Sequence, residues 1–347
     1  MLTLSQATAY TKKFLKYTGL ILGAILSIII IVRGVFALKE IISPTPPPPP
    51  TVSFGRLPKI AFPRSVTEKR LKYSVNTLSG SLPVFSDRAA VNKMTGYAPN
   101  ILDVDNANRK ARAIGFSRNG TKLSDANYRW TEASALQKEL TMNIITSDFV
   151  MSSLFLQNPG VISAGNVGNE YGAAGVAEGF LNTMGTFPPD IDKAKTTTIK
   201  YSISNGSLVP ATSLSNTQII GVYFYQKDVN SLPIYYPNGG TSTIFLLVAG
   251  GNRQPEVVAV DFSHQGILEH QATYPIKTAQ EALDELKEGR GYIARYDVSL
   301  SDIQIKDVFL GYFRSVEKQE YLLPIVIFEG EGFYGYVEAV RDEWLDN

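Results

Sequence analysis

The chain has 347 residues, of which 44% are hydrophobic and 11% aromatic. These fractions are typical of packed cores and exclude a largely disordered chain. Lys and Arg number 33 against 32 Asp and Glu, a net charge of +1, which argues against a nucleic-acid-binding surface or a polybasic lipid-binding face. Because the sequence contains no cysteine, disulfides, a lipid-modified cysteine and thiolate metal sites are excluded.

An apolar segment near the N-terminus predicts a transmembrane helix over residues 17–38. About 20 apolar residues span the hydrocarbon core of a bilayer, and the one charge within this segment, Arg33, lies close to its end. Small residues recur at every fourth position within it, namely Gly19, Gly23 and Ser27. Such a face lets two membrane helices approach closely and predicts a homodimer or a contact with another membrane helix. The alternative is that glycine is frequent in membrane helices in general.

The charges around this segment predict its orientation. Three lysines precede it, at positions 12, 13 and 16, whereas only Arg33 and Lys39 lie near its other end. The positive-inside rule therefore places residues 1–16 in the cytoplasm and the main part of the chain outside it, as a single-pass protein of the cell membrane. The alternative is a signal peptide cleaved after Ala37, since the residues before that bond fit the small-residue rule. An outer part without cysteine is more typical of a bacterial envelope protein than of a small secreted eukaryotic one.

Residues 39–58 predict a stiff, proline-rich linker. They contain Pro44 and the unbroken block Pro46–Pro50, which cannot form a helix. In a polyproline II conformation the positions 44–50 span roughly 20 Å, at about 3.1 Å per residue. The segment therefore predicts a stalk that holds the outer part off the membrane. The alternative is a proline-rich ligand for a recognition domain.

Beyond the linker, the patterns predict two extracytoplasmic α+β regions, over residues 59–160 and 161–347. The first region is predicted to contain a β-hairpin of alternating apolar residues, a helix capped by Asp103 or Asp105, and two further strands, over residues 71–85, 103–114, 128–130 and 140–144. The second region begins with a helix over residues 172–184, followed by strands over 198–203, 219–225, 243–249 and 257–262.

The last predicted helix begins at a capping box, Thr278-Ala-Gln-Glu281, and ends at Gly289. Strands follow it over residues 292–296, 303–312, 321–329 and 333–340. The order of one helix, a glycine and then strands thus occurs three times in the chain. Because hairpin-length gaps join the strands, the pattern predicts an α+β fold of antiparallel sheets, each packed by a helix.

The C-terminal segment carries a resemblance to a known family. It runs in the order TYPIKTAQEALDELKEGRGYI, DVFLGYF, YLLPIVIFEG and GFYGYVEAV, within about residues 274–340. It resembles the C-terminal part of membrane-anchored extracytoplasmic regulators of the YycH/YycI type, and more loosely PepSY-like units. The matching residues are mainly of helix, turn and core types: Glu281, Ala282, Leu283, Gly289, Leu310, Gly311, Tyr312, Pro324 and Phe328. The resemblance implies an N-terminal anchor, β-rich outer domains and control of a partner membrane protein without catalysis.

The sequence contains two histidines, His264 and His270, with Asp261, Ser263 and Glu269 nearby. A metal site or an Asp–Ser–His arrangement needs a third ligand or an oxyanion hole, and nothing in the sequence fixes either. Both histidines are therefore interpreted as surface polar residues. No segment matches the spacing of a calcium loop or of a nucleotide-binding motif. We therefore expect no catalytic residues, no metal and no cofactor.

Together these features predict a non-catalytic binding, regulatory or scaffolding protein of the bacterial cell envelope. Its expected contacts are the lipid bilayer, through residues 17–38, and another envelope or membrane protein, with no nucleic acid. A recognition surface is expected at aromatic residues near the C-terminus, namely Tyr312, Phe333 and Tyr334. The alternative function is an envelope hydrolase with a carboxylate-based site that the sequence does not reveal.

Overall fold

The computed structural model describes residues 18, 23, 26–34, 49–67, 71–165, 167–251, 254–300 and 302–346. Residues 26–34 are helical and exposed, and the Ser27 hydroxyl donates to the carbonyl oxygen of Gly23 at 2.9 Å. No helix of the described residues is long and apolar enough to cross a membrane. The predicted cytoplasmic tail, Gly19 and parts of the predicted span and linker lie outside the described residues. Residues Pro50–Asn347 form one compact unit, called the body below.

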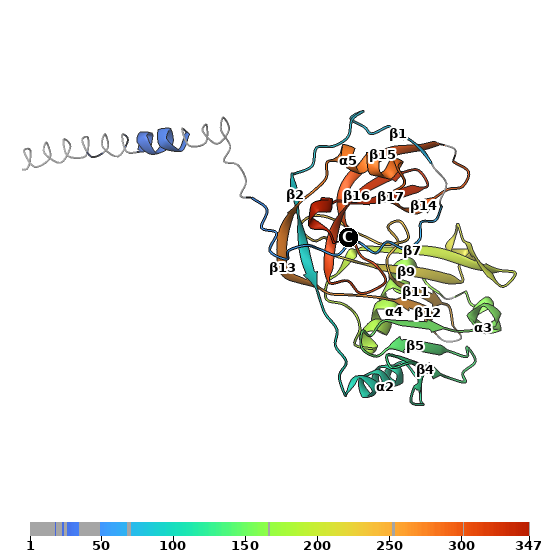
Figure 1. Cartoon of the computed structure of the whole chain (residues 1–347). Helices are drawn as coiled ribbons and strands as arrows, with labels where there is room; N and C mark the ends of the chain where they lie inside the picture. Colours follow the sequence, from blue (N-terminus) through green and yellow to red (C-terminus); the bar gives the residue numbers. More distant parts are fainter. Residues whose placement is uncertain are drawn as a thin grey trace, which may run out of the picture. The chain divides into compact units, whose positions relative to one another are not determined.

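Within the described residues the strands form two sheets, and the larger one is antiparallel throughout (Figure 1). Its strands are β3 (Thr121–Lys122), β4 (Asn127–Thr131), β5 (Glu139–Asn143), β6 (Phe149–Ser152), β7 (Ile191–Ser204), β8 (Ser207–Pro210), β9 (Ile219–Gln226), β11 (Ile244–Ala249) and β12 (Glu256–Phe262). Their order is β3-β4-β5-β6-β12-β11-β9-β7-β8. The pairing of β6 with β12 places Phe149 opposite Phe262, so segments more than a hundred residues apart lie side by side.

Two helices cover one face of the larger sheet. They are α2 (Asp103–Ala113) and α4 (Glu170–Thr183), and both bury alanines in the core beneath them. Alternation along β11 separates the two faces: Leu246 and Val248 belong to this core, whereas Leu247 and Ala249 point to the other face. The other face packs against Val161 in the short helix α3 (Pro159–Ile162).

The smaller sheet combines parallel and antiparallel pairs. Its strands are β1 (Lys72–Val75), β2 (Arg88–Met94), β10 (Ile234–Tyr235), β13 (Ile267–Pro275), β14 (Tyr292–Tyr296), β15 (Asp302–Phe313), β16 (Tyr321–Gly330) and β17 (Phe333–Glu338). The antiparallel strands β15, β16 and β17 continue to β14, while β1 and β10 pair in parallel with β15. Strand β2 pairs with both β13 and β16. Helix α5 (Ala279–Lys287) packs on β17 and buries Leu283 and Leu286 (Figure 1).

The first segment of the body, residues 50–67, runs over the smaller sheet and is called the strap below. It forms backbone hydrogen bonds with three elements: Val52 with Thr273 of β13, Leu57 with Trp344 and Asp346 at the C-terminal end, and Val66 with Ile293 of β14. The last of these bonds covers the edge of β14 that β17 leaves open. The strap therefore fastens the start of the body to its end.

The predicted α+β class is confirmed in its coarse form, since the described residues contain two large sheets and few helices. The hairpin predicted over residues 71–85 is wrong. Residues 72–75 pair in parallel with 302–305 of β15, and residues 82–85 do not form a strand. Alternation shows only that one side of a strand is buried, and here that side packs beside Ile303 and Ile305, far away in the sequence.

The three predicted helices are present, but they do not each pack a sheet of their own. Helices α2 and α4 share the larger sheet, so the repeated order of helix and strands does not correspond to repeated units. The predicted division at residue 160 runs through this same sheet, because β6 before it pairs with β12 after it.

The capping box predicted at the start of α5 is confirmed. Thr278 Oγ1 accepts from the backbone nitrogen of Glu281 at 3.2 Å, and Glu281 Oε2 accepts from the backbone nitrogen of Thr278 at 2.7 Å. Thr278→Ala removes the first of these bonds and is expected to lower the free energy of unfolding by about 1 kcal/mol. Urea unfolding followed by circular dichroism measures the loss. Thr278→Ser keeps the hydroxyl and serves as the control, and an alanine variant as stable as the wild type contradicts the prediction.

Candidate functional site

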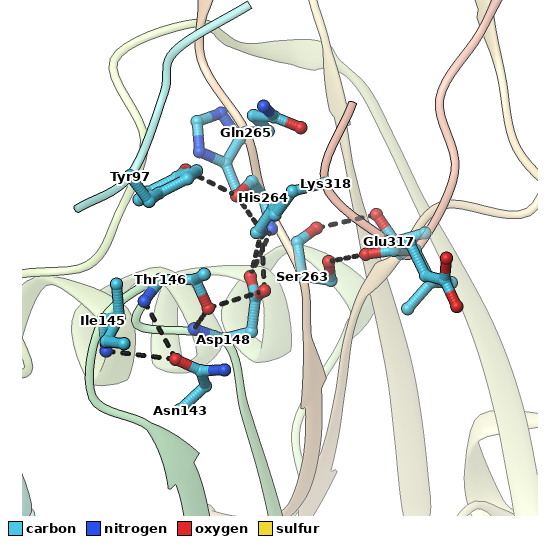
Figure 2. Close-up of polar contacts among 12 residues, drawn as sticks. Tyr97, Asn143, Ile145, Thr146, Asp148, Ser263, His264, Gln265, Glu317 and Lys318 are labelled. Carbon is cyan, nitrogen blue, oxygen red and sulfur yellow. Dashed lines mark hydrogen bonds and ion pairs between the residues drawn. The ribbon is translucent and has the colours of Figure 1, made fainter. Parts of the chain in front are cut away.

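Polar side chains gather where the larger and smaller sheets meet, and this region is called the junction below. They come from the segments that follow β2, β12 and β15, from the residues just before β6 and β7, and from the end of β9. Its members are Tyr97, Asp148, Asp190, Gln226, Ser263, His264, Gln265, Arg314, Lys318 and Gln319. Figure 2 shows part of this cluster around His264.

A turn before β6 places Asp148 in the junction. The side-chain oxygen of Asn143 accepts from the backbone nitrogens of Ile145 and Thr146, at 3.0 and 3.1 Å, as asparagine commonly does in turns. Thr146 Oγ1 then donates to Asp148 Oδ2 at 2.9 Å, and Asp148 binds Lys318 Nζ at 2.6 Å (Figure 2). Burial lowers the pKa of the Lys318 ammonium, and the bond to Asp148 offsets part of this effect.

His264 uses both its ring and its backbone to join the two sheets. Its Nε2 lies 2.8 Å from Asp190 Oδ1, and its backbone nitrogen donates to Asp148 at 3.2 Å. Its carbonyl oxygen accepts from Lys318 Nζ at 2.8 Å and from the Tyr97 hydroxyl at 3.3 Å (Figure 2). Burial raises the pKa of Asp190, but the hydrogen bonds from His264 and Gln226 outweigh it, so this pKa is lower than usual. The His264 side chain is therefore held in a structural network.

Arg314 is a fully buried cation beside this network. Its Nη2 lies 3.3 Å from Ser263 Oγ and its Nη1 lies 3.5 Å from the carbonyl oxygen of Glu317. Among the described residues, its Nε has no hydrogen-bond partner and no carboxylate forms an ion pair with it. Burial lowers the pKa of the Arg314 guanidinium. Ser263 donates in turn to the carbonyl oxygen of Val316 at 3.1 Å.

These contacts exclude the Asp–Ser–His arrangement for the conformation described. The Ser263 hydroxyl bonds to a carbonyl and to Arg314, whereas the His264 ring bonds to Asp190, so no base lies beside the hydroxyl. The interpretation of His264 as a surface residue is also wrong, because only 16% of its side chain is exposed. His270 is exposed and lies edge-on to Phe54, with 4.9 Å between ring centroids. No group of residues suited to a metal ion occurs within the described part of the chain.

A groove of about 520 Å³ lies next to the junction. Its lining comes from the strap, from β11, β12 and β14, from the segment before β11, and from the segment between β15 and β16. The lining includes three aromatic side chains, Phe62, Phe245 and Tyr292, and two carboxylates, Asp261 and Glu317. Partial burial of the Asp261 carboxyl raises its pKa, and the negative charge of Asp148 raises it further. The groove thus combines apolar walls with a few polar groups, as small-ligand sites do.

The predicted recognition residues do not share an exposed surface. Tyr312 and Phe333 are both 0% exposed, because their positions on β15 and β17 face the cores of the smaller sheet. The Tyr312 hydroxyl donates to the carbonyl oxygen of Ala90 at 2.9 Å. Tyr334 is half-buried, and its hydroxyl donates to Glu329 Oε1 at 2.7 Å. Alternation along a strand could not show which of these rings face solvent, since both faces of this sheet are covered.

Sequence reasoning identified His264, Ser263 and Asp261 but missed their partners Asp148, Asp190 and Lys318. Between 54 and 116 residues separate His264 from these partners. No local motif marks such a set, and only the pairing of the strands brings it together. The turn residue Asn143 was the one local signal available for the position of Asp148.

No protein-family model and no curated protein matches the chain. Among solved structures, the chain is similar to an uncharacterized protein from Eubacterium rectale, known from a crystal structure. The two share 14% sequence identity with a TM-score of 0.41, over 80% of this chain and 85% of the other.

Proposed function

We propose that the chain is a single-pass, membrane-anchored extracytoplasmic protein of the bacterial cell envelope, whose body binds another envelope or membrane protein without catalysing a reaction. The observation that carries this proposal is the groove beside the junction. It has the size of a ligand site, whereas the ionisable groups of the neighbouring junction, such as His264 and Lys318, are bonded to other residues of the body. The resemblance of residues 274–340 to YycH/YycI-type regulators supports the control of a membrane partner.

A photo-crosslinking amino acid at Val316 tests the binding role. Val316 lines the groove and is 54% exposed, so its replacement is compatible with the fold. Irradiation of intact cells is expected to join the chain to one envelope protein through this position. Val298 is 81% exposed and does not line the groove, so the same amino acid placed there is the matched control. Equal products from both positions, or none from Val316, would contradict binding at the groove.

The membrane orientation is tested by protease treatment of intact spheroplasts. The apolar segment over 17–38 and the lysines before it support an anchor with a cytoplasmic N-terminus. Protease is expected to remove the body after Pro50 while sparing a tag attached to Met1. Lysed spheroplasts are the control, in which the tag is also lost. A mature chain that begins at Leu38 would show instead that the segment is a cleaved signal peptide.

A further inference from the structure

We infer that the groove is a binding site for a positively charged group on an aliphatic stem, of the kind that lysine and arginine side chains carry. This inference rests on the proposed binding function and names the chemistry of the ligand. It depends on three features of the groove: two carboxylates without a hydrogen-bond or ion-pair partner among the described residues, the arrangement of the cations around it, and aromatic side chains in its lining.

The first feature is the pair of carboxylates, Asp261 from β12 and Glu317 from the segment after β15. Among the described residues, neither carboxylate has a hydrogen-bond or ion-pair partner. The acidic residues of the neighbouring junction differ, because Asp148 is paired with Lys318 and Asp190 with His264. Asp261 and Glu317 are therefore available to a cationic ligand, which supplies the direct partner that each carboxylate lacks.

The second feature is the arrangement of the cations around the groove. Arg64 is the one basic residue that lines it in the described part of the chain, and Arg64 has an interaction of its own. The buried Arg314 lies behind Ser263, and its guanidinium nitrogens are directed at Ser263 and at the carbonyl oxygen of Glu317. The influences on Asp261 are burial and the charge of Asp148, and both raise its pKa. A bound ammonium or guanidinium group reverses this effect by favouring the ionised carboxylate.

The third feature is the aromatic part of the lining. Phe62 and Tyr292 are stacked with 5.2 Å between ring centroids, and Phe245 is stacked on Tyr223 at 4.4 Å. Phe245 lies directly opposite Asp261 in the register of β11 and β12, so an aromatic ring and a carboxylate are neighbours on one face. Aromatic faces attract cations and also pack against the methylene groups of a long side chain. A lysine or arginine side chain satisfies both requirements.

Titration calorimetry of the full-length chain in a neutral detergent tests the inference. The probes are the N-acetyl methylamides of lysine, arginine and norleucine, with cadaverine as an amine outside a peptide. The lysine and arginine probes are expected to bind at least about tenfold more tightly than norleucine, which has the same stem without the charge. Added salt is expected to weaken the binding of the charged probes but not of norleucine. If cadaverine binds as well as the lysine probe, the ligand is an amine and the peptide backbone adds nothing.

The variant Asp261→Asn/Glu317→Gln is expected to reduce the affinity for the charged probes at least about tenfold. Glu331→Gln, which removes an exposed carboxylate outside the groove, is the matched control and should bind as the wild type does. Equal affinities of the wild type for the lysine and norleucine probes overturn the inference, as does an absence of binding at millimolar concentrations. These results need no variant, so they hold even if the double variant does not fold. If the lysine and norleucine probes bind equally, or not at all, while crosslinking through Val316 persists, the binding function stands and only the inferred ligand chemistry fails.

Discussion

Trp130→Ala is expected to lower the free energy of unfolding of the chain by about 3–5 kcal/mol. Trp130 on β4 is 1% exposed and lies in the core between the larger sheet and α2. Its indole nitrogen donates to Asn108 Oδ1 at 3.0 Å, so the substitution leaves both a cavity and a buried amide with one partner fewer. Urea unfolding followed by circular dichroism measures the change.

The matched control for this prediction is Tyr171→Ala. Tyr171 is a large aromatic residue at the start of α4, but it is 89% exposed, so its removal is expected to change stability by less than about 0.5 kcal/mol. Similar losses in the two variants would show that Trp130 is not buried as described.

Glu338→Gln is expected to raise the free energy of unfolding by about 3 kcal/mol at pH 8 and to leave it unchanged at pH 4. Glu338 Oε1 accepts from the backbone nitrogen of Ile60 in the strap at 3.0 Å. Burial raises the pKa of this carboxyl from 4.5 to about 7, although the Ile60 bond and the charges of Lys277 and Lys59 oppose it. Asp342 adds to the rise.

The direction of this pH dependence follows from the pKa of Glu338 in the folded and in the unfolded chain. The folded chain holds the Glu338 proton more tightly than the unfolded chain, so the contribution of Glu338 to stability is fully present below about pH 4.5 and is lost as the pH rises through about 7. Glutamine cannot ionise and keeps an oxygen for the Ile60 nitrogen, so it removes this loss. Urea unfolding at a series of pH values measures the difference between variant and wild type. The exposed Glu343→Gln is the control. A constant difference at all pH values would contradict the raised pKa.

Local patterns predicted the elements of the fold better than their partners. The capping box of α5 and the strand over residues 292–296 were predicted at the positions where the structure has them. Both depend on residues that are close together in the sequence. Strand β1 was predicted as a strand, but its parallel partner β15 lies some 230 residues away. An alternating segment gains the same burial from any suitable edge, so its sequence does not specify which edge it joins.

The same limit applies to the candidate site. Asp261 was recognised as a chemical group near His264, but the role proposed for it depends on Phe245 and Glu317. These two residues line the same groove through the pairing of β11 with β12 and through the segment after β15. Nothing in the sequence indicated that Arg314 would be buried. Only the fold reveals that this cation is fully buried.

The contacts of the strap follow one another in the order of its residues, so a pull on the chain at Pro50 would load them one after another. From Pro50 onward, these contacts are the bonds of Thr51 and Val52 with Thr273, then the parallel bridge between Leu57 and Leu345, and then the bond from Ile60 to Glu338. These contacts lie in series along the chain. Peeling beyond Ile60 carries Phe62 out of the wall of the groove. The strap is therefore both the link between the start and the end of the body and one wall of the groove.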